Sequence, residues 1–445
     1  MRMTTKTLST AILAGSALLL AAGTACAQSV VNLTALRQTA LMPDGNVVPM
    51  WGWLCGNPTA TTAGGTGTAA PSGGATCTQT GGAAQSVGST APSTVWQPPL
   101  ITVPYTATAG ASTTGLKIIL TNTLPVPTSL TIVGQLPNPA DANGAGHPTR
   151  ESGRPQHDTQ TATTWTTVVT GQAPFVPPTQ GPRAQAFVQE AAATTGTITY
   201  SWTSLTPGTY LIESGSYPSI QGPMGLYGVL VVTNAPTGGG TATFATGTAY
   251  PSPTGAVTTT GVPYDADAVL LLSEVDAVQN QAADTAVRTT GFSPFAKWSP
   301  ACSPSGPAAT ANTCYPPAVD FTPTYYLIDG HSFDRTNPAL SALNVGSNYS
   351  TGNVLLRFVN ASLRMHMPSV VGLQMTEIAD DGHLQPDVTL ALTKGTTLAT
   401  CPSGNAPVVG GCPKVQNDWF MPAGKVLDIV VKPAGTAAAG YTSTY

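Results

Sequence analysis

The chain has 445 residues, only 8% of them charged, and a formal net charge of −4. An average soluble protein carries about 25% charged residues, and so weak a charge argues against a basic nucleic-acid-binding surface or an acidic tail. The 47 glycines and 40 prolines separate short apolar runs, which favours many strands joined by turns. The length predicts two globular units.

The first 27 residues have the features of a cleaved secretory signal. Arg2 and Lys6 supply positive charge, residues 11–22 form an apolar run, and small residues precede the expected cleavage at residue 27. That run is shorter than the roughly 20 residues that a transmembrane helix needs. We therefore expect a periplasmic or extracellular protein with no transmembrane span.

The mature chain begins with apolar runs on either side of the turn Asp44-Gly45. Residues 57–94 are nearly all small or polar, and we interpret them as a low-complexity insertion. Strands are expected at 100–103, 116–120, 129–133 and 196–202, and the apolar region 207–232 follows them.

Residues 234–263 are rich in Gly, Thr and Pro, and we place an interdomain linker at 246–262. Further strands are expected at 268–274, 325–330, 354–360 and 426–431, with a short helix within 275–287 and a hairpin turn at Ala379-Asp-Asp-Gly382 that follows 375–378. The pattern predicts an all-β chain of two β-sandwiches, residues 28–245 and 263–445, although no internal repeat is visible.

Removal of a signal containing Cys26 leaves six of the seven cysteines. They lie as neighbours, and local pairing in an oxidising compartment is the simplest expectation: Cys55–Cys77, Cys302–Cys314 and Cys401–Cys412. No Cys-x-x-Cys is present, so the spacing does not favour zinc.

Five segments, in this order, resemble the first two domains of the multicopper oxidase superfamily. They are Asn-Thr-Leu-Pro-Val-Pro-Thr-Ser-Leu-Thr-Ile-Val-Gly-Gln at 122–135, Gly-Thr-Tyr with Met-Gly-Leu-Tyr-Gly inside 207–232, a stretch ending in Ile-Asp-Gly at 321–330, and segments 354–361 and 421–429. The resemblance implies two cupredoxin-like Greek-key β-sandwiches. It also implies copper as cofactor, with a mononuclear site that oxidises substrate and a trinuclear cluster that reduces dioxygen.

The copper ligands implied by the resemblance are not in their places. The first histidine pair of the family falls on Thr131 and Val133, and the second on Glu213 and Gly215. None of these side chains offers the imidazole nitrogen that such copper sites use. The five histidines include no His-x-His, and no mature cysteine has a histidine beside it. We therefore expect copper not to be bound by this chain alone.

Other candidates are weaker. His366 lies between Met365 and Met367 and could hold Cu(I) through soft sulfur, but a strand-end histidine with core methionines is the simpler interpretation. His147 and His157, in a polar loop, could form a surface metal site or simply be solvated, and the role of His383 stays open.

Two interpretations of acidic residues can be tested by structure. Glu213 is expected either to be buried and protonated or to organise the loop that copper would otherwise hold. The acids around the apolar run 268–272 are interpreted as solvated strand ends: Asp265, Asp267, Glu274 and Asp276.

The sequence therefore favours an exported multicopper-oxidase-like protein that supplies scaffold domains. The family's third domain would follow Tyr445, and a C-terminal continuation or a second secreted polypeptide would bring the copper sites. The substrate would be a metal ion or a phenol. The alternative, from a different class, is a non-catalytic structural or binding protein of the cell envelope. No nucleophile elbow, zinc-protease motif or phosphate-binding loop is present.

Overall fold

The structure is a computed structural model, and it describes residues 29–56, 74–80, 95–108, 111–135, 188–235, 247–251, 261–294, 312–336, 342–344, 352–385, 388, 413–432 and 442–444. Within these residues the chain is mostly β-structure in several mixed sheets, as predicted. The predicted signal at 1–27 and most of the insertion at 57–94 lie outside the described residues.

A four-stranded sheet, in the order β2-β1-β7-β9, forms the first of three layers. Its strands are β1 (Ser29–Leu41), β2 (Val47–Cys55), β7 (Leu116–Asn122) and β9 (Thr197–Trp202). β1 and β7 run parallel, whereas the other neighbours are antiparallel. Buried residues alternate along β7, as expected of a strand with one face on a core.

A five-stranded sheet, in the order β3-β4-β11-β10-β8, forms the middle layer. Its strands are β3 (Thr76–Gln79), β4 (Pro99–Pro104), β8 (Thr131–Ile132), β10 (Gly208–Glu213) and β11 (Tyr227–Thr233). One face packs on the first sheet through a core that includes Trp53, Ile118 and Ile212. Every residue of β11 is buried, because this sheet is covered on both faces.

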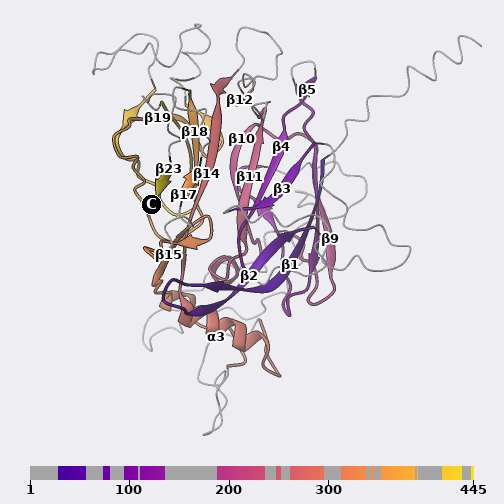
Figure 1. The fold of residues 1–445 in the computed structure, drawn as a ribbon. Helices are drawn as coiled ribbons and strands as arrows, with labels where there is room; N and C mark the ends of the chain where they lie inside the picture. Colours follow the sequence, from indigo (N-terminus) through magenta and orange to yellow (C-terminus); the bar gives the residue numbers. More distant parts are fainter. Residues whose placement is uncertain are drawn as a thin grey trace, which may run out of the picture.

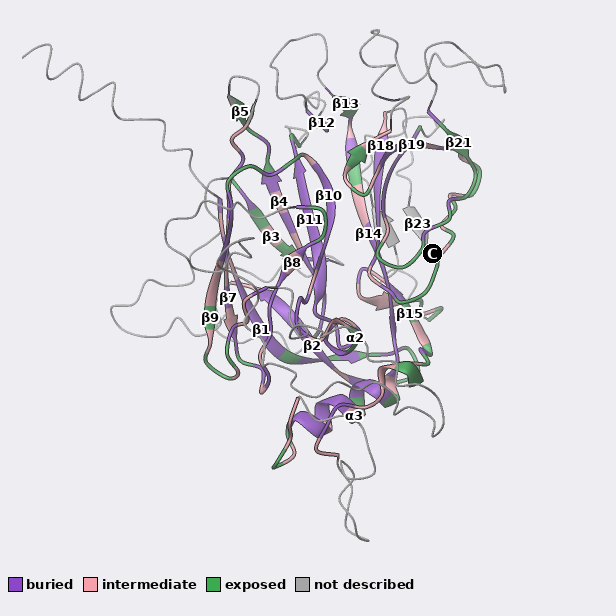
Figure 2. Ribbon diagram, turned by 180° about the vertical axis from the view of Figure 1, so that it is seen from behind, coloured by how far each residue is buried: buried purple, intermediate pink, exposed green. Residues whose placement is uncertain are grey.

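The third layer is an eight-stranded sheet, in the order β16-β15-β14-β18-β22-β19-β20 with β21 paired to β19. Its strands are β14 (Ala266–Val275), β15 (Tyr325–Ile328), β16 (His331–Ser332), β18 (Val354–Asn360), β19 (Met375–Asp380), β20 (His383–Leu384), β21 (Val415–Gln416) and β22 (Val426–Val431). Leu271 and Val359 pack against Leu211 and Val229 of the middle layer. Figures 1 and 2 show the three layers side by side from opposite directions.

The remaining elements are short. They are β5 (Ala107–Thr108), β6 (Ala111–Ser112), β12 (Gly247–Ala249), β13 (Val262–Tyr264), β17 (Ala342–Asn344), β23 (Thr442–Thr444), α2 (Pro218–Gln221), η2 (Ala318–Asp320) and α3 (Ala277–Val287). Helix α3 confirms the helix expected within 275–287 and lies below β2 (Figure 1). Arg37 of β1 forms an ion pair with Asp284 of this helix, and its Nε lies 2.6 Å from Oδ1 of Asp284. Within the described residues no helix is long and apolar enough to span a membrane.

Two predicted turns are confirmed. Gly45, at a φ of 85°, lies between β1 and β2, and Asp381 and Gly382, at 47° and 78°, join β19 to β20. Positive φ at both central residues is what a two-residue type I′ hairpin requires. The strand expected at 129–133 is shorter than predicted, because only Thr131–Ile132 pairs in the sheet.

The structure contains an internal repeat that the sequence does not show. Asn122 ends β7 and Asn360 ends β18, and each of these strands pairs in parallel with an earlier one. Each side-chain Nδ2 donates to the carbonyl four residues later and to two consecutive carbonyls of another segment: Val126, Ala191 and Ala192 for Asn122, and Arg364, Met421 and Pro422 for Asn360. Each Oδ1 accepts from the N–H two residues later.

The repeat extends beyond the two asparagines. Six residues after each one, Thr128 bridges to Ala191 and His366 bridges to Met421. An asparagine can cap a strand end in this way because its amide donates twice and accepts twice. The same hydrogen-bond pattern therefore organises one corner in each half of the chain.

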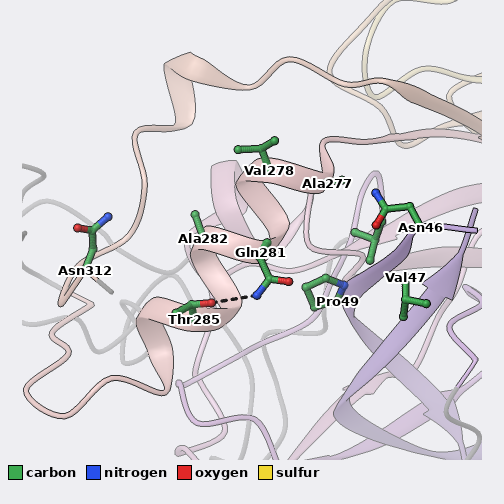
Figure 3. Close-up of a pocket in the computed structure, with 10 residues that line it drawn as sticks. Asn46, Val47, Pro49, Ala277, Val278, Gln281, Ala282, Thr285 and Asn312 are labelled. Carbon is green, nitrogen blue, oxygen red and sulfur yellow. Dashed lines mark hydrogen bonds between the residues drawn. The ribbon is translucent and has the colours of Figure 1, made fainter. Parts of the chain in front are cut away.

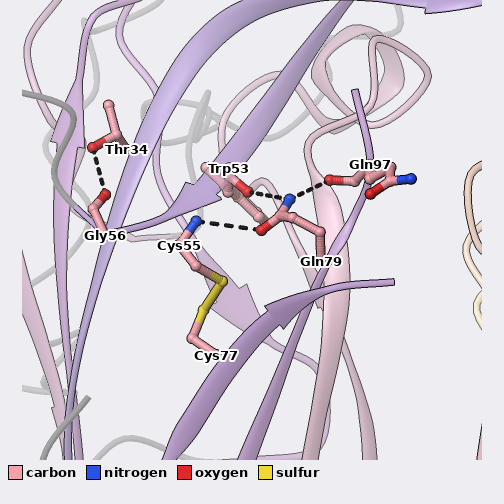
Figure 4. The surroundings of a disulfide bond; sticks show 7 residues. All are labelled: Thr34, Trp53, Cys55, Gly56, Cys77, Gln79 and Gln97. Carbon is pink, nitrogen blue, oxygen red and sulfur yellow. Dashed lines mark hydrogen bonds between the residues drawn. A yellow bond between two sulfur atoms is a disulfide. The ribbon is translucent and has the colours of Figure 1, made fainter. Parts of the chain in front are cut away.

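The predicted Cys55–Cys77 disulfide is present, with its Cα atoms 5.7 Å apart, and it joins β2 of the first layer to β3 of the middle layer. Beside it, Gln79 Nε2 donates to the carbonyls of Trp53 and Gln97 (Figure 4). Cys314 is also disulfide-bonded. Its predicted partner Cys302 lies outside the described residues, as do Cys401 and Cys412.

The double substitution Cys55→Ala/Cys77→Ala is expected to lower the free energy of unfolding by about 3 kcal/mol, because the cross-link restricts the unfolded chain. Urea denaturation under non-oxidising and oxidising conditions measures the difference. As the control, wild type and variant are compared after reduction, where the difference between them should disappear although other disulfides are also reduced. An unchanged denaturation midpoint in the variant would contradict the prediction.

The interpretation of the acids around β14 as solvated strand ends is wrong for two of them, because the other layers cover that strand. Glu274 is only 3% exposed and accepts from the N–H of Leu363. Asp276, 5% exposed, caps α3 by accepting from Val278 and Gln279.

Candidate functional site

Three of the four positions where the resemblance places copper ligands come together. Thr131 and Glu213 are partners across β8 and β10. Their neighbours Ile132 and Ile212 face the core of the first two layers, so Thr131 and Glu213 lie on the opposite face. A Cβ atom on Gly215 would lie 2.9 Å from Cγ2 of Thr131. Val133, the fourth position, follows two residues after Thr131 and is 42% exposed.

The residues present at this place do not fit copper. The hydroxyl of Thr131 already donates to the carbonyl oxygen of Glu213 (3.2 Å). Gly215 has no side chain, and a larger residue would overlap Ser129 and Thr131. One carboxylate remains, and burial raises the pKa of Glu213. A neutral hydroxyl and a single carboxyl are not the imidazole set that such copper sites require.

Neutral hydrogen bonds hold the loop beside this place. Gln221 of α2 is completely buried, and its Oε1 accepts from Ser214 (2.6 Å) and Thr128 (2.8 Å). Ser129 and Ser216 share a further hydrogen bond of 2.9 Å. Each of these polar side chains is buried and has a partner, so the network orders the loop by itself.

The motif Met-Gly-Leu-Tyr-Gly at 224–228 serves close packing. A Cβ atom on Gly225, whose φ is 111°, would lie 2.6 Å from the carbonyl oxygen of Trp51 and from Nε1 of Trp96. A Cβ atom on Gly228 would lie 2.7 Å from Pro99. Both positions therefore need glycine so that neighbouring backbone and ring atoms can approach.

The structure separates His366 from its flanking methionines. Met365 and Met367 are 67% and 61% exposed. His366 is half-buried, shares a 2.9 Å hydrogen bond with Ser362 Oγ, and stands edge-on to Tyr326. Successive side chains of an extended segment point to opposite sides, so the two sulfurs do not face the imidazole. Burial lowers the pKa of His366.

The other two described histidines, His331 and His383, lie at opposite ends of the third sheet. The ring of His383 lies on the exposed hairpin turn, with Nδ1 2.9 Å from the carbonyl oxygen of Asp381. His147 and His157 lie outside the described residues. His331, which the sequence analysis did not single out, is bound by the side-chain amide of Gln97 (3.0 Å), and burial lowers its pKa.

Asp329 is a buried acid between the layers. It opens the turn after β15 with a φ of 54°, and its Oδ1 accepts from the N–H of Leu271 (3.0 Å). The carbonyl of Asp329 accepts from Thr80 of the middle layer. Burial raises the pKa of Asp329 to about 7, against 3.8 ordinarily.

A charged cluster around Arg357 joins the middle layer to the third. Arg357 is completely buried, and its Nε lies 2.8 Å from Oδ2 of Asp267, its Nη1 3.6 Å from Oδ2 of Asp428. Asp428 Oδ2 accepts from Thr209 of β10 (3.0 Å) and from Tyr250 (2.6 Å). The sequence hid this cluster, because Arg357 stands inside an apolar strand and its acids lie about 70 to 90 residues away.

Within this cluster, the opposite charges of Arg357 and its acids act on their pKa values against the effect of burial. Burial raises the pKa of Asp428, and the neighbouring Arg357 acts against that rise. Burial alone would lower the pKa of Arg357, but Asp267 and Asp428 raise it. The guanidinium also lies 5.4 Å from the ring centroid of Tyr264. We interpret the cluster as a structural joint, because Arg357 and Asp428 at its centre are closed to solvent and only Asp267 reaches the surface.

A groove of about 470 Å³ lies between the start of β2 and α3 (Figure 3). Its described lining includes Asn46, Pro49, Gln281 and Thr285 and contains no titratable side chain. More widely, the described part of the chain holds no group of three or more His, Cys, Asp or Glu residues arranged to bind a metal ion.

No protein-family profile matches this sequence, and no curated protein matches it.

Solved structures do match. A blue copper oxidase from Nitrosomonas europaea is 14% identical over 90% of this chain and 74% of its own, with a TM-score of 0.42. Fet3p, a multicopper oxidase that functions in iron import, is 12% identical over 92% of this chain and 46% of its own, with a TM-score of 0.43. A laccase from Botrytis aclada is 16% identical over 93% of this chain and 48% of its own, with a TM-score of 0.39. The structural neighbours of this chain are thus multicopper oxidases and laccases, at low identity.

Proposed function

We propose that this chain is an exported multicopper-oxidase-like protein that supplies two cupredoxin-like Greek-key β-sandwiches. Any oxidase activity then depends on copper sites outside this chain. A C-terminal continuation or a second secreted polypeptide would supply them. Dioxygen would be the electron acceptor, and a metal ion or a phenol the substrate.

The internal repeat supports the two-sandwich part of the proposal. The corners at Asn122 and Asn360 share one hydrogen-bond pattern, and each follows a strand paired in parallel with an earlier strand. Two copies of one corner, one in each half, are expected if the halves have the same Greek-key topology.

One observation supports the proposal that this chain acts as a scaffold. Other side chains occupy the place where the histidine pairs of the family would lie. Thr131, Glu213 and Gly215 meet there, and the adjoining loop is ordered by neutral hydrogen bonds around Gln221. A scaffold that keeps its loop in shape without metal fits a supporting role in this half of the chain.

The test is copper content. We expect purified mature protein, loaded with excess copper and then dialysed, to retain far less than one copper per chain and to show no strong blue absorption band. The double variant Thr131→His/Glu213→His is the positive control. It places two imidazoles on a cross-strand pair, where Cβ atoms lie about 5 Å apart, and should retain more copper than Thr131→His alone.

The possible outcomes separate the candidates. Near-stoichiometric copper with a blue band in the wild-type chain would overturn the scaffold proposal. Oxidase activity that appears when a second secreted polypeptide is added would support it. Failure of every co-secreted polypeptide to bring activity would instead favour the structural or binding protein of the cell envelope.

A further inference from the structure

A lysine and two acidic side chains share one face of the third layer. Lys425 immediately precedes β22, and Leu427 and Ile429 follow on the same face because strand side chains alternate. On β19, Asp380 is the partner of Leu427 and Glu377 is the partner of Ile429. Lys425, Asp380 and Glu377 therefore lie on that same face.

A β-bulge makes this arrangement possible. Glu377 and Asp380 are three positions apart, so a regular strand would direct them to opposite faces. The pairing with β22 shifts between Glu377 and Ala379. Ile378 and Ala379 both pack into the same hydrophobic cluster, as expected of the two residues of a bulge. The next residue, Asp380, is thereby returned to the face of Glu377.

The lysine and the aspartate are held in direct contact. Nζ of Lys425 touches Oδ1 of Asp380, and the two side chains are only 21% and 34% exposed. Two hydrogen bonds between the neighbouring residues Asp381 and Val426 hold the two strands together at the contact. The N–H of Asp381 donates to the carbonyl of Val426 (2.9 Å), and the N–H of Val426 donates to Oδ1 of Asp381 (2.9 Å).

Glu377 is a buried acid beside this pair. It is 4% exposed, and its Oε2 has no hydrogen-bond partner within the described residues. The Nζ atom of Lys414, a mostly exposed side chain, lies 3.9 Å from this Oε2. Burial raises the pKa of Glu377, with Lys425 and Asp380 both within electrostatic reach.

We propose that Lys425 and Asp380 are a modification site at which the folded protein forms an intramolecular isopeptide bond. One proton first passes from the Lys425 ammonium to the Asp380 carboxylate within the contact. Nζ then attacks Cγ of Asp380, and an N–C bond forms. The C–O bond to the hydroxyl breaks, and this hydroxyl leaves with one amine proton as water. No atom changes oxidation state, and no other reactant is consumed.

The surroundings set the rate and the consequence of this reaction. Burial alone would lower the pKa of Lys425, but Asp380 and Asp381 raise it, so the ion pair is the resting state and the condensation is slow. Fixed proximity replaces a bimolecular encounter. The bond would tie β19 to β22 next to Gly382, whose Cα lies against Tyr210 and Gly208 of the middle layer.

Peptide mapping of the reduced, aged mature protein tests the proposal. Cleavage after lysine and arginine should release peptide 365–394 joined to a peptide in which Lys425 is uncleaved, lighter than the sum of the two by one water. Finding both peptides separate, with complete cleavage after Lys425, would overturn it.

Variants at the three positions sharpen this test. Lys425→Arg and Asp380→Ala should abolish the link. Asp380→Asn should restore the same linked product, with loss of ammonia in place of water, whereas an ion pair alone would leave no linked peptide. Asp418→Ala, at an exposed aspartate outside the contact, should keep the link, and loss of the link in this variant as well would contradict the assignment to Asp380.

Glu377 is assigned as a positioning residue. Glu377→Ala should lower the linked fraction at a fixed incubation time, because it leaves space beside the pair, and Glu377→Gln should restore it, because Gln keeps the volume and the polar end of the buried side chain. Near-ultraviolet circular dichroism confirms that each variant is folded. An equal linked fraction in all three proteins would remove Glu377 from the proposal.

Discussion

Replacing Arg357 with methionine is expected to lower the free energy of unfolding by about 3–5 kcal/mol, the usual cost of removing one partner of a buried ion pair. Arg357 is 0% exposed and Asp428 1% exposed, so water cannot replace the lost guanidinium. Asp428 would stay buried with only the hydroxyls of Thr209 and Tyr250 as partners. Urea denaturation of wild type and variant measures the loss.

Two further variants make this result specific to the charge. Arg357→Met/Asp428→Asn should recover part of the loss, because the unpaired buried carboxylate is gone while Tyr250 keeps an acceptor. Arg335→Met, at an exposed position, should change the free energy of unfolding by less than about 0.5 kcal/mol. If Arg357→Met cost no more than Arg335→Met, the cluster would not join the two layers energetically.

Asp329→Asn is expected to make the protein more stable than wild type at pH 8, by up to about 4 kcal/mol. The pKa of Asp329 is about 7 in the folded protein, against 3.8 ordinarily, and each pH unit between two pKa values corresponds to about 1.4 kcal/mol. Asparagine is neutral at every pH and keeps an oxygen to accept from Leu271.

The sign follows from proton binding. Between about pH 4 and pH 7 the folded state holds a proton on Asp329 that the unfolded state has released. The contribution of Asp329 to stability is therefore fully present below about pH 4 and is lost as the pH rises through 7. Above pH 7 the folded protein carries a buried carboxylate at a cost in free energy.

Denaturation midpoints of wild type and Asp329→Asn, measured from pH 4.5 to pH 8, test this. The difference between the two proteins should grow as the pH rises. Asp320→Asn, at an exposed position, should follow the wild-type curve. Parallel curves for wild type and Asp329→Asn would show that Asp329 does not titrate in this range.

Local features were predictable because they depend on a few neighbouring residues. Asp44-Gly45 and Asp381-Gly382 form turns because the backbone there needs positive φ. The helix expected within 275–287 forms as α3, although its cap Asp276 is not the solvated strand end that the sequence indicated. Cys55 and Cys77 pair between β2 and β3, and they are neighbouring cysteines in the sequence.

The sequence predicted which two segments, 122–135 and 207–232, would contribute to the candidate site, but not how they meet. The positions of Thr131 and Glu213 came from the resemblance, and the sequence could not show that they meet across β8 and β10. The role of Gln221, which binds Ser214 and Thr128, depends on a side chain reaching back from α2. No sequence pattern predicts such a contact, because residues about 90 positions apart supply it.

By itself the sequence determined the β-strands, several turns, one helix, one disulfide and the lack of histidine at four expected ligand positions. Apolar runs, glycines and cysteines encode these features within short windows. Only the tertiary structure decided which charges are buried, that Asn122 and Asn360 form equivalent corners, and that a bulge brings Glu377 and Asp380 to the face of Lys425. The reason is physical: the burial of a strand face depends on the sheet that covers it, and that sheet comes from a distant part of the chain.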